Sequence, residues 1–145
     1  MTMNDLQRAA LVLFAAREAG EGASLEQMKA ICYCMRNRVR AGWHDGSWLA
    51  SIEHADEVAA HDYMTMRLDP ANRALQRLTH DIDDICYGTG IETLAGEGDL
   101  ESSIGEQKFW MFLNRPPSSW FVKHIVKDQK NHPSHAQMGL MMFFE

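Results

Sequence analysis

The sequence predicts a single, mostly helical α+β domain that spans residues 1–145. Up to about Tyr87, apolar residues recur at helical spacing, in segments that glycines and capping residues separate. From about residue 108 the pattern changes to two compact apolar runs, 108–113 and 137–144, which are typical of strands. A chain of 145 residues is long enough to bury a core without disulfides. We therefore expect helices followed by a short C-terminal β-hairpin, or two adjacent strands, that pack against them.

The first two helices have the clearest predicted boundaries. A helix over residues 4–19 is expected to end at Gly20 and Gly22, because glycine enters the left-handed region at low cost. Ser24, with Gln27 three residues later, forms a capping-box pattern that begins the second helix. The apolar face of this second helix repeats at alternating steps of three and four residues: Leu25, Met28, Cys32, Met35 and Val39.

Two further helices are predicted from their start signals. Ser47 is a suitable N-cap for a short helix over residues 48–54. Asp69-Pro70 predicts the start of a helix that extends to about Tyr87, because proline fits the first helical position. Three aspartates on this helix resemble a metal cluster, but we interpret them as part of a solvated polar face: Asp81, Asp83 and Asp84.

The composition disfavours several functional classes. A net charge of −6 lacks the basic footprint that sequence-independent binding to nucleic acid requires. No apolar run is long enough to span a membrane, and no secretory cleavage site follows the apolar run 9–16. Three cysteines without a pairing framework suit a reducing compartment, so at face value we expect a cytoplasmic protein with no membrane insertion. We interpret three neighbouring cations as a solvated helix face: Arg36, Arg38 and Arg40.

The joint between the first two helices is the candidate site, because it carries Glu18 and Glu21. Glu18 lies one turn after Phe14 and therefore continues an apolar stripe. Burial and the negative end of the helix dipole both favour the neutral carboxyl that a general acid needs. Glu21, in the glycine turn, has no such environment. From the residues alone, the joint is either a catalytic site or an acidic, solvated turn.

Tryptophans near this joint are candidates for stacking on sugar rings. Trp43 follows the second helix, and its position is compatible with either core packing or sugar stacking. Trp48 is expected in the core.

Several segments of the chain together resemble the signature of the SleB-type cell-wall hydrolases, which include spore-cortex-lytic enzymes and related lysins. The N-terminal match consists of Glu18-Ala19-Gly20-Glu21, Glu26-Gln27-Met28-Lys29-Ala30-Ile31 and Asn37-Arg38-Val39. The C-terminal half is similar to the aromatic segment, the Trp-containing loop and the closing strand of the family. Here these are Phe109-Trp110-Met111-Phe112, Trp120-Phe121 and residues 138–144.

The resemblance implies a lysozyme-like helical domain that cleaves peptidoglycan between N-acetylmuramic acid and N-acetylglucosamine. It implies Glu18 as the general acid, with no metal and no organic cofactor. The substrate-binding residues that we predict are Glu21, Phe109, Trp110 and Asn114. Hydrolysis normally uses two carboxylates, whereas a lytic transglycosylase can use one. Because one carboxylate is well placed, the transglycosylase version is slightly favoured over a muramidase.

An alternative from another class is a catalytically inactive glycan-binding or scaffold protein on the same fold. Met141 stands where the family strand usually carries His, and no export signal is evident. A small helical regulatory module is a third interpretation, which the aromatic C-terminal runs disfavour. The position of Glu18 separates these interpretations. An open cleft near Phe109 or Trp110 favours an enzyme, whereas full burial against Arg36 or Arg38 indicates a structural carboxylate.

Overall fold

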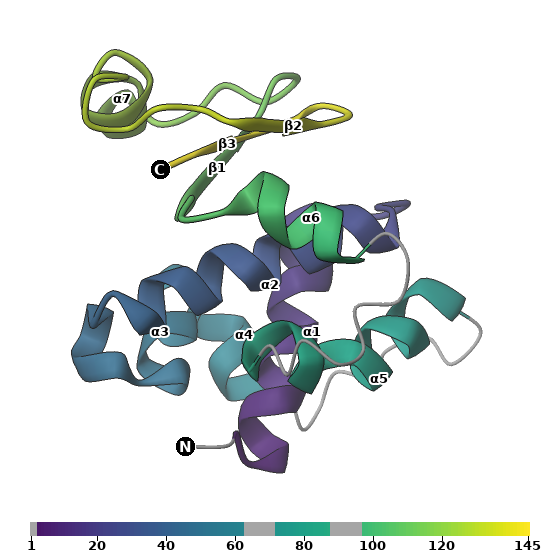
Figure 1. Cartoon of the computed structure of the whole chain (residues 1–145). Helices are drawn as coiled ribbons and strands as arrows, with labels where there is room; N and C mark the ends of the chain where they lie inside the picture. The colour runs from purple at the N-terminus through teal and green to yellow at the C-terminus, as the bar shows by residue number, and fades with distance from the viewer. Residues whose placement is uncertain (1–2, 63–71, 88–96) are drawn as a thin grey trace.

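A computed structural model of the chain describes residues 3–62, 72–87 and 97–145. This part is mostly helical and contains one small antiparallel sheet, as the α+β prediction expected. Figure 1 shows the sheet and α7 above a layer of helices, with the N-terminus at the bottom and the C-terminus beside the sheet. The helices are α1 (Asp5–Ala19), α2 (Leu25–Arg40), α3 (Trp48–Ala55), α4 (Glu57–Asp62), α5 (Arg73–Tyr87), α6 (Glu97–Ile104) and α7 (Ser119–Phe121). Two shorter turns are η1 (Trp43–Gly46) and the π-helical η2 (Val122–Val126).

The predicted helix starts agree with the caps in the structure. Ser24 Oγ accepts a hydrogen bond from the Gln27 amide, and the Gln27 side chain accepts one from the Ser24 amide. Ser47 Oγ caps α3 by accepting from the amide of Ala50. The start signal predicted at Asp69-Pro70 lies outside the described residues, and α5 is described from Arg73 onward.

Helix α2 lies at the centre of the helical layer, where it packs against α1, α5 and α6. Its segment Met28–Asn37 is buried on every side, so its polar residues need partners within the protein. Lys29 Nζ lies 2.8 Å from Asp81 Oδ2 of α5, and Arg36 Nη1 lies 2.6 Å from Glu101 Oε1 of α6. The interpretation of Arg36 and Asp81 as solvated is therefore wrong, because neighbouring helices cover both faces that carry them.

The sheet has the strand order β1-β3-β2, with β1 (Phe109–Phe112), β2 (Ala136–Met138) and β3 (Met141–Phe144) all antiparallel. The second apolar run is thus a hairpin in itself, because Gly139 takes a φ of 58° and lets the chain reverse. Strand β1 then pairs with β3, with Phe109 opposite Phe144. We call residues 108–145, which include this sheet, the C-terminal lobe.

The core joins the lobe to the helices. Met141 and Phe143 of β3 are fully buried in the same apolar cluster as Phe14 and Ile31. All three cysteines are buried and free, and Trp48 is buried as predicted. Within the described residues, no helix combines the length and apolar character needed to cross a bilayer.

Candidate functional site

Glu18 lies at the C-terminal end of α1 and is held by a residue of the sheet. Trp110 Nε1 donates a hydrogen bond of 2.9 Å to Glu18 Oε1. The Trp110 ring packs against Phe14, one turn before Glu18, with 5.9 Å between the ring centroids. The carboxyl is half-buried, and no other hydrogen bond to it from a described residue is present. The Trp110 bond therefore orients one oxygen of Glu18 and leaves Oε2 without a hydrogen bond from the described residues.

Two cavities meet at Glu18. One, of about 530 Å³, lies between the helices and the C-terminal lobe, and the other, of about 300 Å³, lies beside the turn after β1. Both are lined by Glu18, Trp110 and Phe121. The larger cavity is also lined by Arg38, Trp43, His54, Ala55, Phe109 and Trp120. The carboxyl thus lies where two adjoining cavities share a wall, and the larger of them is lined mainly by aromatic residues.

Arg38 brings a positive charge into the larger cavity. Its Nε donates a hydrogen bond of 2.7 Å to the carbonyl of Lys108, immediately before β1. The guanidinium carbon lies 4.6 Å from the ring centroid of Trp110 and 5.0 Å from that of Trp43, in cation–π geometry. Burial lowers the pKa of Arg38 to about 10, although nearby Cys34 and Glu18 act in the opposite direction. The group therefore stays charged at neutral pH, close to the Glu18 carboxyl.

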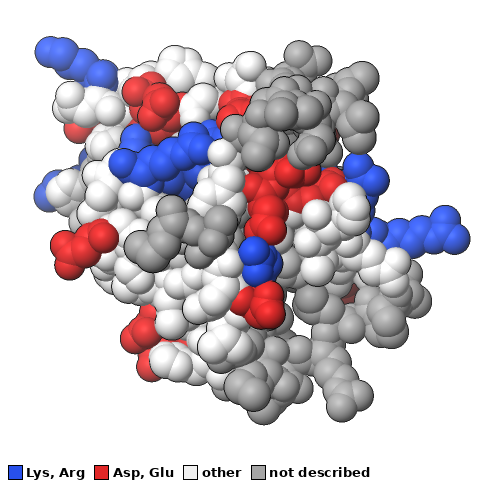
Figure 2. Space-filling model, turned by 60° about the horizontal axis from the view of Figure 1, so that its bottom comes forward, with Lys and Arg blue, Asp and Glu red and all other residues white. Residues whose placement is uncertain are grey.

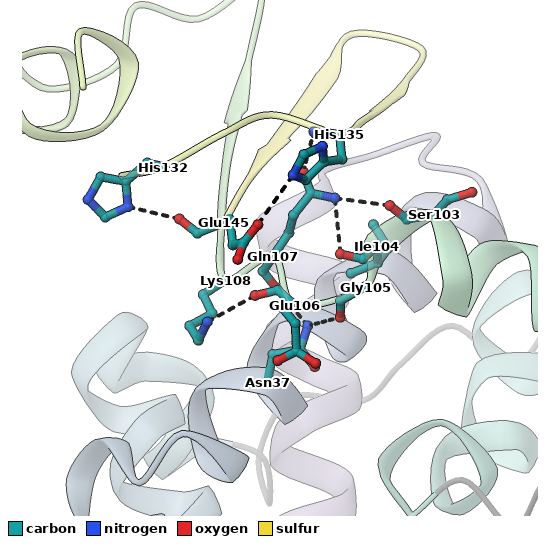
Figure 3. A network of polar contacts seen from close by, with 10 residues as sticks. All are labelled: Asn37, Ser103, Ile104, Gly105, Glu106, Gln107, Lys108, His132, His135 and Glu145. Atoms are coloured by element: carbon teal, nitrogen blue, oxygen red, sulfur yellow. Dashed lines mark hydrogen bonds and ion pairs between the residues drawn. The ribbon is translucent and has the colours of Figure 1, made fainter. Parts of the chain in front are cut away.

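A buried polar network fixes the start of β1 (Figure 3). Asn37 Nδ2 donates to the carbonyls of Gly105 and Gln107, at 2.7 and 2.8 Å. The Gln107 side chain donates to the carbonyls of Ser103 and Ile104 and accepts from the amide of His135. Asn37 and Gln107 are themselves almost fully buried, and the bonds from Asn37 to the Gln107 carbonyl and from Gln107 to the Ile104 carbonyl lie away from water. The network ties α2, α6 and the C-terminal lobe together two residues before Phe109.

Gly20 ends α1 at the edge of the smaller cavity. Its φ is 85°, and a Cβ at this position would lie 2.9 Å from Arg115 Nη2. The Arg115 guanidinium carbon lies 4.4 Å from the ring centroid of Phe112. The backbone conformation therefore favours glycine here, and any larger residue would also displace the end of the Arg115 side chain.

The structure brings together three of the predicted site residues: Glu18, Phe109 and Trp110. Glu21 is exposed in the glycine turn, and Asn114 is exposed after β1. Neither lines either of the two cavities. Met141, which occupies the position of the family histidine, is fully buried in the core.

Residue-by-residue reasoning missed Arg38 as part of the site. It was interpreted as a solvated cation, whereas the structure places it among the rings of Trp43, Phe109 and Trp110. Its place in the Asn37-Arg38-Val39 motif was the available signal. Trp43, left open between two roles, lines the larger cavity and packs on Phe109 at 5.5 Å between ring centroids.

No group of three or more His, Cys, Asp or Glu side chains is arranged to hold a metal ion within the parts of the chain that the structure describes. Asp81, taken with Asp83 and Asp84 as a polar face, instead accepts from Lys29 and Arg77.

Comparison of the chain with protein-family models, with curated proteins and with solved structures gives no match. The geometry around Glu18 is therefore what supports a function.

Proposed function

We propose that the chain is a peptidoglycan-cleaving enzyme of the SleB type, with a lysozyme-like helical domain and Glu18 as its general acid. The observation that carries the proposal is the half-buried Glu18 carboxyl, oriented by Trp110 at the wall that two cavities share. A polymer that is cut in its middle needs binding space on both sides of the acid. The two adjoining cavities supply that space.

The first step is proton transfer from Glu18 to the glycosidic oxygen as the bond to the anomeric carbon breaks. One carboxyl oxygen is already held by the Trp110 N–H, so the other is available to carry the proton. The carboxylate that forms is stabilised by the same N–H and by the positive charge of Arg38 nearby.

The second step favours transglycosylation. Among the described residues that line the two cavities, Glu18 is the one carboxylate, and hydrolysis normally uses a pair. In the transglycosylase route, Glu18 takes the proton of the muramic 6-hydroxyl. The freed oxygen then bonds to the anomeric carbon and gives a 1,6-anhydro product. Glu18 thus acts as the acid in the first step and as the base in the second.

The aromatic walls suit a sugar polymer. Sugar rings present apolar C–H faces that stack on aromatic rings, and such rings bury a large area without fixing a charge. Phe109 and Trp43 line one side of the acid, and Phe112 lines the other. Phe121 belongs to both cavities and would contact the strand at the point of cleavage.

The test is release of soluble muropeptides from purified peptidoglycan, compared between wild type and Glu18→Gln by mass spectrometry. We expect 1,6-anhydro products from the wild type and at least about a hundredfold less release from the variant, since general acid catalysis contributes this much or more. Hydrated reducing ends would indicate the muramidase version. If the folded wild type releases nothing from several peptidoglycan types, the glycan-binding or scaffold alternative replaces the enzyme.

A further inference from the structure

Charge is divided unevenly between the two parts of the molecule. The C-terminal lobe, residues 108–145, carries five Lys or Arg against two acidic residues, a net charge of +3. Residues 1–107 carry nine Lys or Arg against eighteen acidic residues, a net charge of −9. The face at the bottom of the molecule, shown in Figure 2, has acidic and basic side chains side by side. An acidic chain with one basic lobe presents a local surface for an anionic partner.

Three lysines of the lobe are exposed along one continuous stretch: Lys123, Lys127 and Lys130. Lys123 and Lys127 are four residues apart, about one turn of η2, where the Lys127 amide bonds to the Val122 carbonyl in the π-helical pattern. The nearby acid, Asp128, accepts two hydrogen bonds from the Asn131 side chain. Among the described residues, no acidic side chain forms an ion pair with any of these three lysines.

This stretch begins at the wall of the larger cavity. Trp120 lines that cavity and is 58% exposed, which is unusual for a tryptophan that only fills a core. Its ring lies 5.1 Å from the ring of His124, between centroids, at 36°. Trp120 lies in α7, which continues directly into η2, the turn that carries Lys123. The lysines therefore follow the aromatic wall of the cavity directly along the chain.

We propose that Lys123, Lys127 and Lys130 bind the free carboxylates of the peptides that peptidoglycan carries, as the glycan strand leaves the cavity past Trp120. This assignment rests on the proposed function for the identity of the polymer. The glycan backbone gives stacking partners for the aromatic wall, and its peptides supply anions at a distance from the sugar rings. Exposed ammonium groups on flexible stems suit anions that have no fixed geometry. Nucleic acid also carries anions, but the acidic helical part would repel a long, uniformly charged duplex.

The test measures binding to insoluble sacculi by sedimentation, in the Glu18→Gln background so that the polymer stays intact. The triple variant Lys123→Glu, Lys127→Glu and Lys130→Glu is expected to bind at least about tenfold more weakly at low salt, because three attractions become repulsions. Raising NaCl from about 0.05 M to about 0.5 M should weaken binding of the parent protein to sacculi and remove most of the difference between parent and triple variant.

Two variants control for charge and position. Replacement of the three lysines by arginine keeps the charge and should bind like the parent. Arg73→Glu changes an exposed cation at the start of α5, in the acidic part, and should leave binding unchanged. Unchanged binding by the lysine-to-glutamate triple, or an equal loss from Arg73→Glu alone, overturns the assignment.

The anion is identified by changing the sacculi. Amidation of their carboxyl groups should lower binding of the parent to the level of the triple variant, and no effect of amidation overturns the assignment. Sacculi stripped of teichoic acid should bind the protein as well as unstripped ones. A loss of binding on stripping would identify teichoic-acid phosphate as the bound anion and would overturn the assignment. Tighter, lysine-dependent binding to DNA fragments than to sacculi also overturns it.

Cleavage is measured in parallel with the otherwise wild-type chain, so that the two proposals fail separately. Lysine-dependent and carboxylate-dependent binding without muropeptide release supports the lysine assignment and rejects the enzyme. Muropeptide release together with lysine-independent binding rejects the lysine assignment and leaves the enzyme standing.

Discussion

Trp110 is the residue on which the orientation of Glu18 depends. The indole N–H can only donate, so in the 2.9 Å bond the Glu18 oxygen must be the acceptor. Arg38 also contacts this ring, with its guanidinium carbon 4.6 Å from the Trp110 centroid. The Trp110 indole therefore orients the Glu18 carboxyl, and the Arg38 guanidinium stacks on the Trp110 ring.

Replacing Trp110 by Phe should lower the rate of muropeptide release about 10-fold to 100-fold. The change removes the N–H but keeps an aromatic ring, and a hydrogen bond to a charged group is worth about 1.5–3 kcal/mol. Trp110 acts as a positioning residue, so affinity for sacculi should stay near that of the wild type while the rate falls. Trp48→Phe, a similar change in the core away from Glu18, is the control. A rate for Trp110→Phe equal to that control would show that the bond does not matter.

The sequence predicts that Gly20 ends α1, but its surroundings in the fold are only partly determined by neighbouring residues in the chain. Its φ of 85° is the expected left-handed region. Arg115, 95 positions away along the chain, has Nη2 2.9 Å from where a Cβ at this position would lie, and no local pattern reveals that neighbour. Glu18 could also be predicted locally, because it continues the apolar stripe of α1 one turn after Phe14. The donor to Glu18 comes from a distant strand, which only the fold brings near.

At the scale of elements, helix α2 depends on buried charge. Asp81 is 2% exposed and accepts from Lys29 and Arg77, and it also contacts His80. Burial acts to raise the pKa of Asp81, but hydrogen bonds from His80, Lys29 and Arg77 outweigh it and lower the pKa to about 2. The ion pair with Lys29 joins α5 to α2 and requires an ionised carboxyl, whereas Arg77 and His80 contact Asp81 from within α5.

Asp81→Asn should lower the free energy of unfolding by about 3 kcal/mol at pH 7, because it removes one partner of a buried ion pair. The folded pKa of about 2 lies below the unfolded value of about 3.9, so this stabilisation is complete above about pH 4. It should shrink as the pH falls toward about 2. Urea unfolding of both proteins across this range measures it. Asp83→Asn, which removes an exposed pair with Arg8, should cost about 1 kcal/mol or less. A cost for Asp81→Asn that does not depend on pH would contradict this account.

The polar network around Asn37 joins elements that are far apart in sequence. Asn37→Ala should destabilise the fold by about 2–3 kcal/mol, because the carbonyls of Gly105 and Gln107 lose a buried donor. Asn131→Ala removes an exposed side chain whose hydrogen bonds within the described residues go to Asp128, and it should change stability by about 0.5 kcal/mol or less. Equal effects of the two changes in thermal or urea unfolding would show that the network does not tie the lobe to α2.

The boundaries of elements were predictable where caps and periodicity determine them, as for α1, α2 and α3. The pairing of strands was not, because the mostly apolar run 137–144 contains no alternation that separates β2 from β3. The turn at Gly139 and the partner β1 are set by packing of Met141 and Phe143 into the core. Burial of Arg36 and Asp81 was also missed, because single-helix patterns do not show which faces other helices cover.

At the scale of the whole molecule, two parts with opposite charge meet at the candidate site. The acidic helical part supplies Glu18, Arg38 and Trp43, and the basic C-terminal lobe supplies Trp110 and the other aromatic residues of the larger cavity. The mostly helical α+β class followed from the sequence, because it depends on local periodicity. The cavity did not, because it is formed only when β1 lies beside the end of α1.

The central claim is that Glu18 acts as the general acid of a peptidoglycan-cleaving site. The most direct test compares muropeptide release by Glu18→Gln with release by Glu21→Gln, which changes an exposed carboxyl three residues away by the same chemistry. Circular dichroism and urea unfolding establish that both variants are folded. We predict at least about a hundredfold loss for Glu18→Gln and a rate within about twofold of the wild type for Glu21→Gln. An active, folded Glu18→Gln protein would contradict the claim.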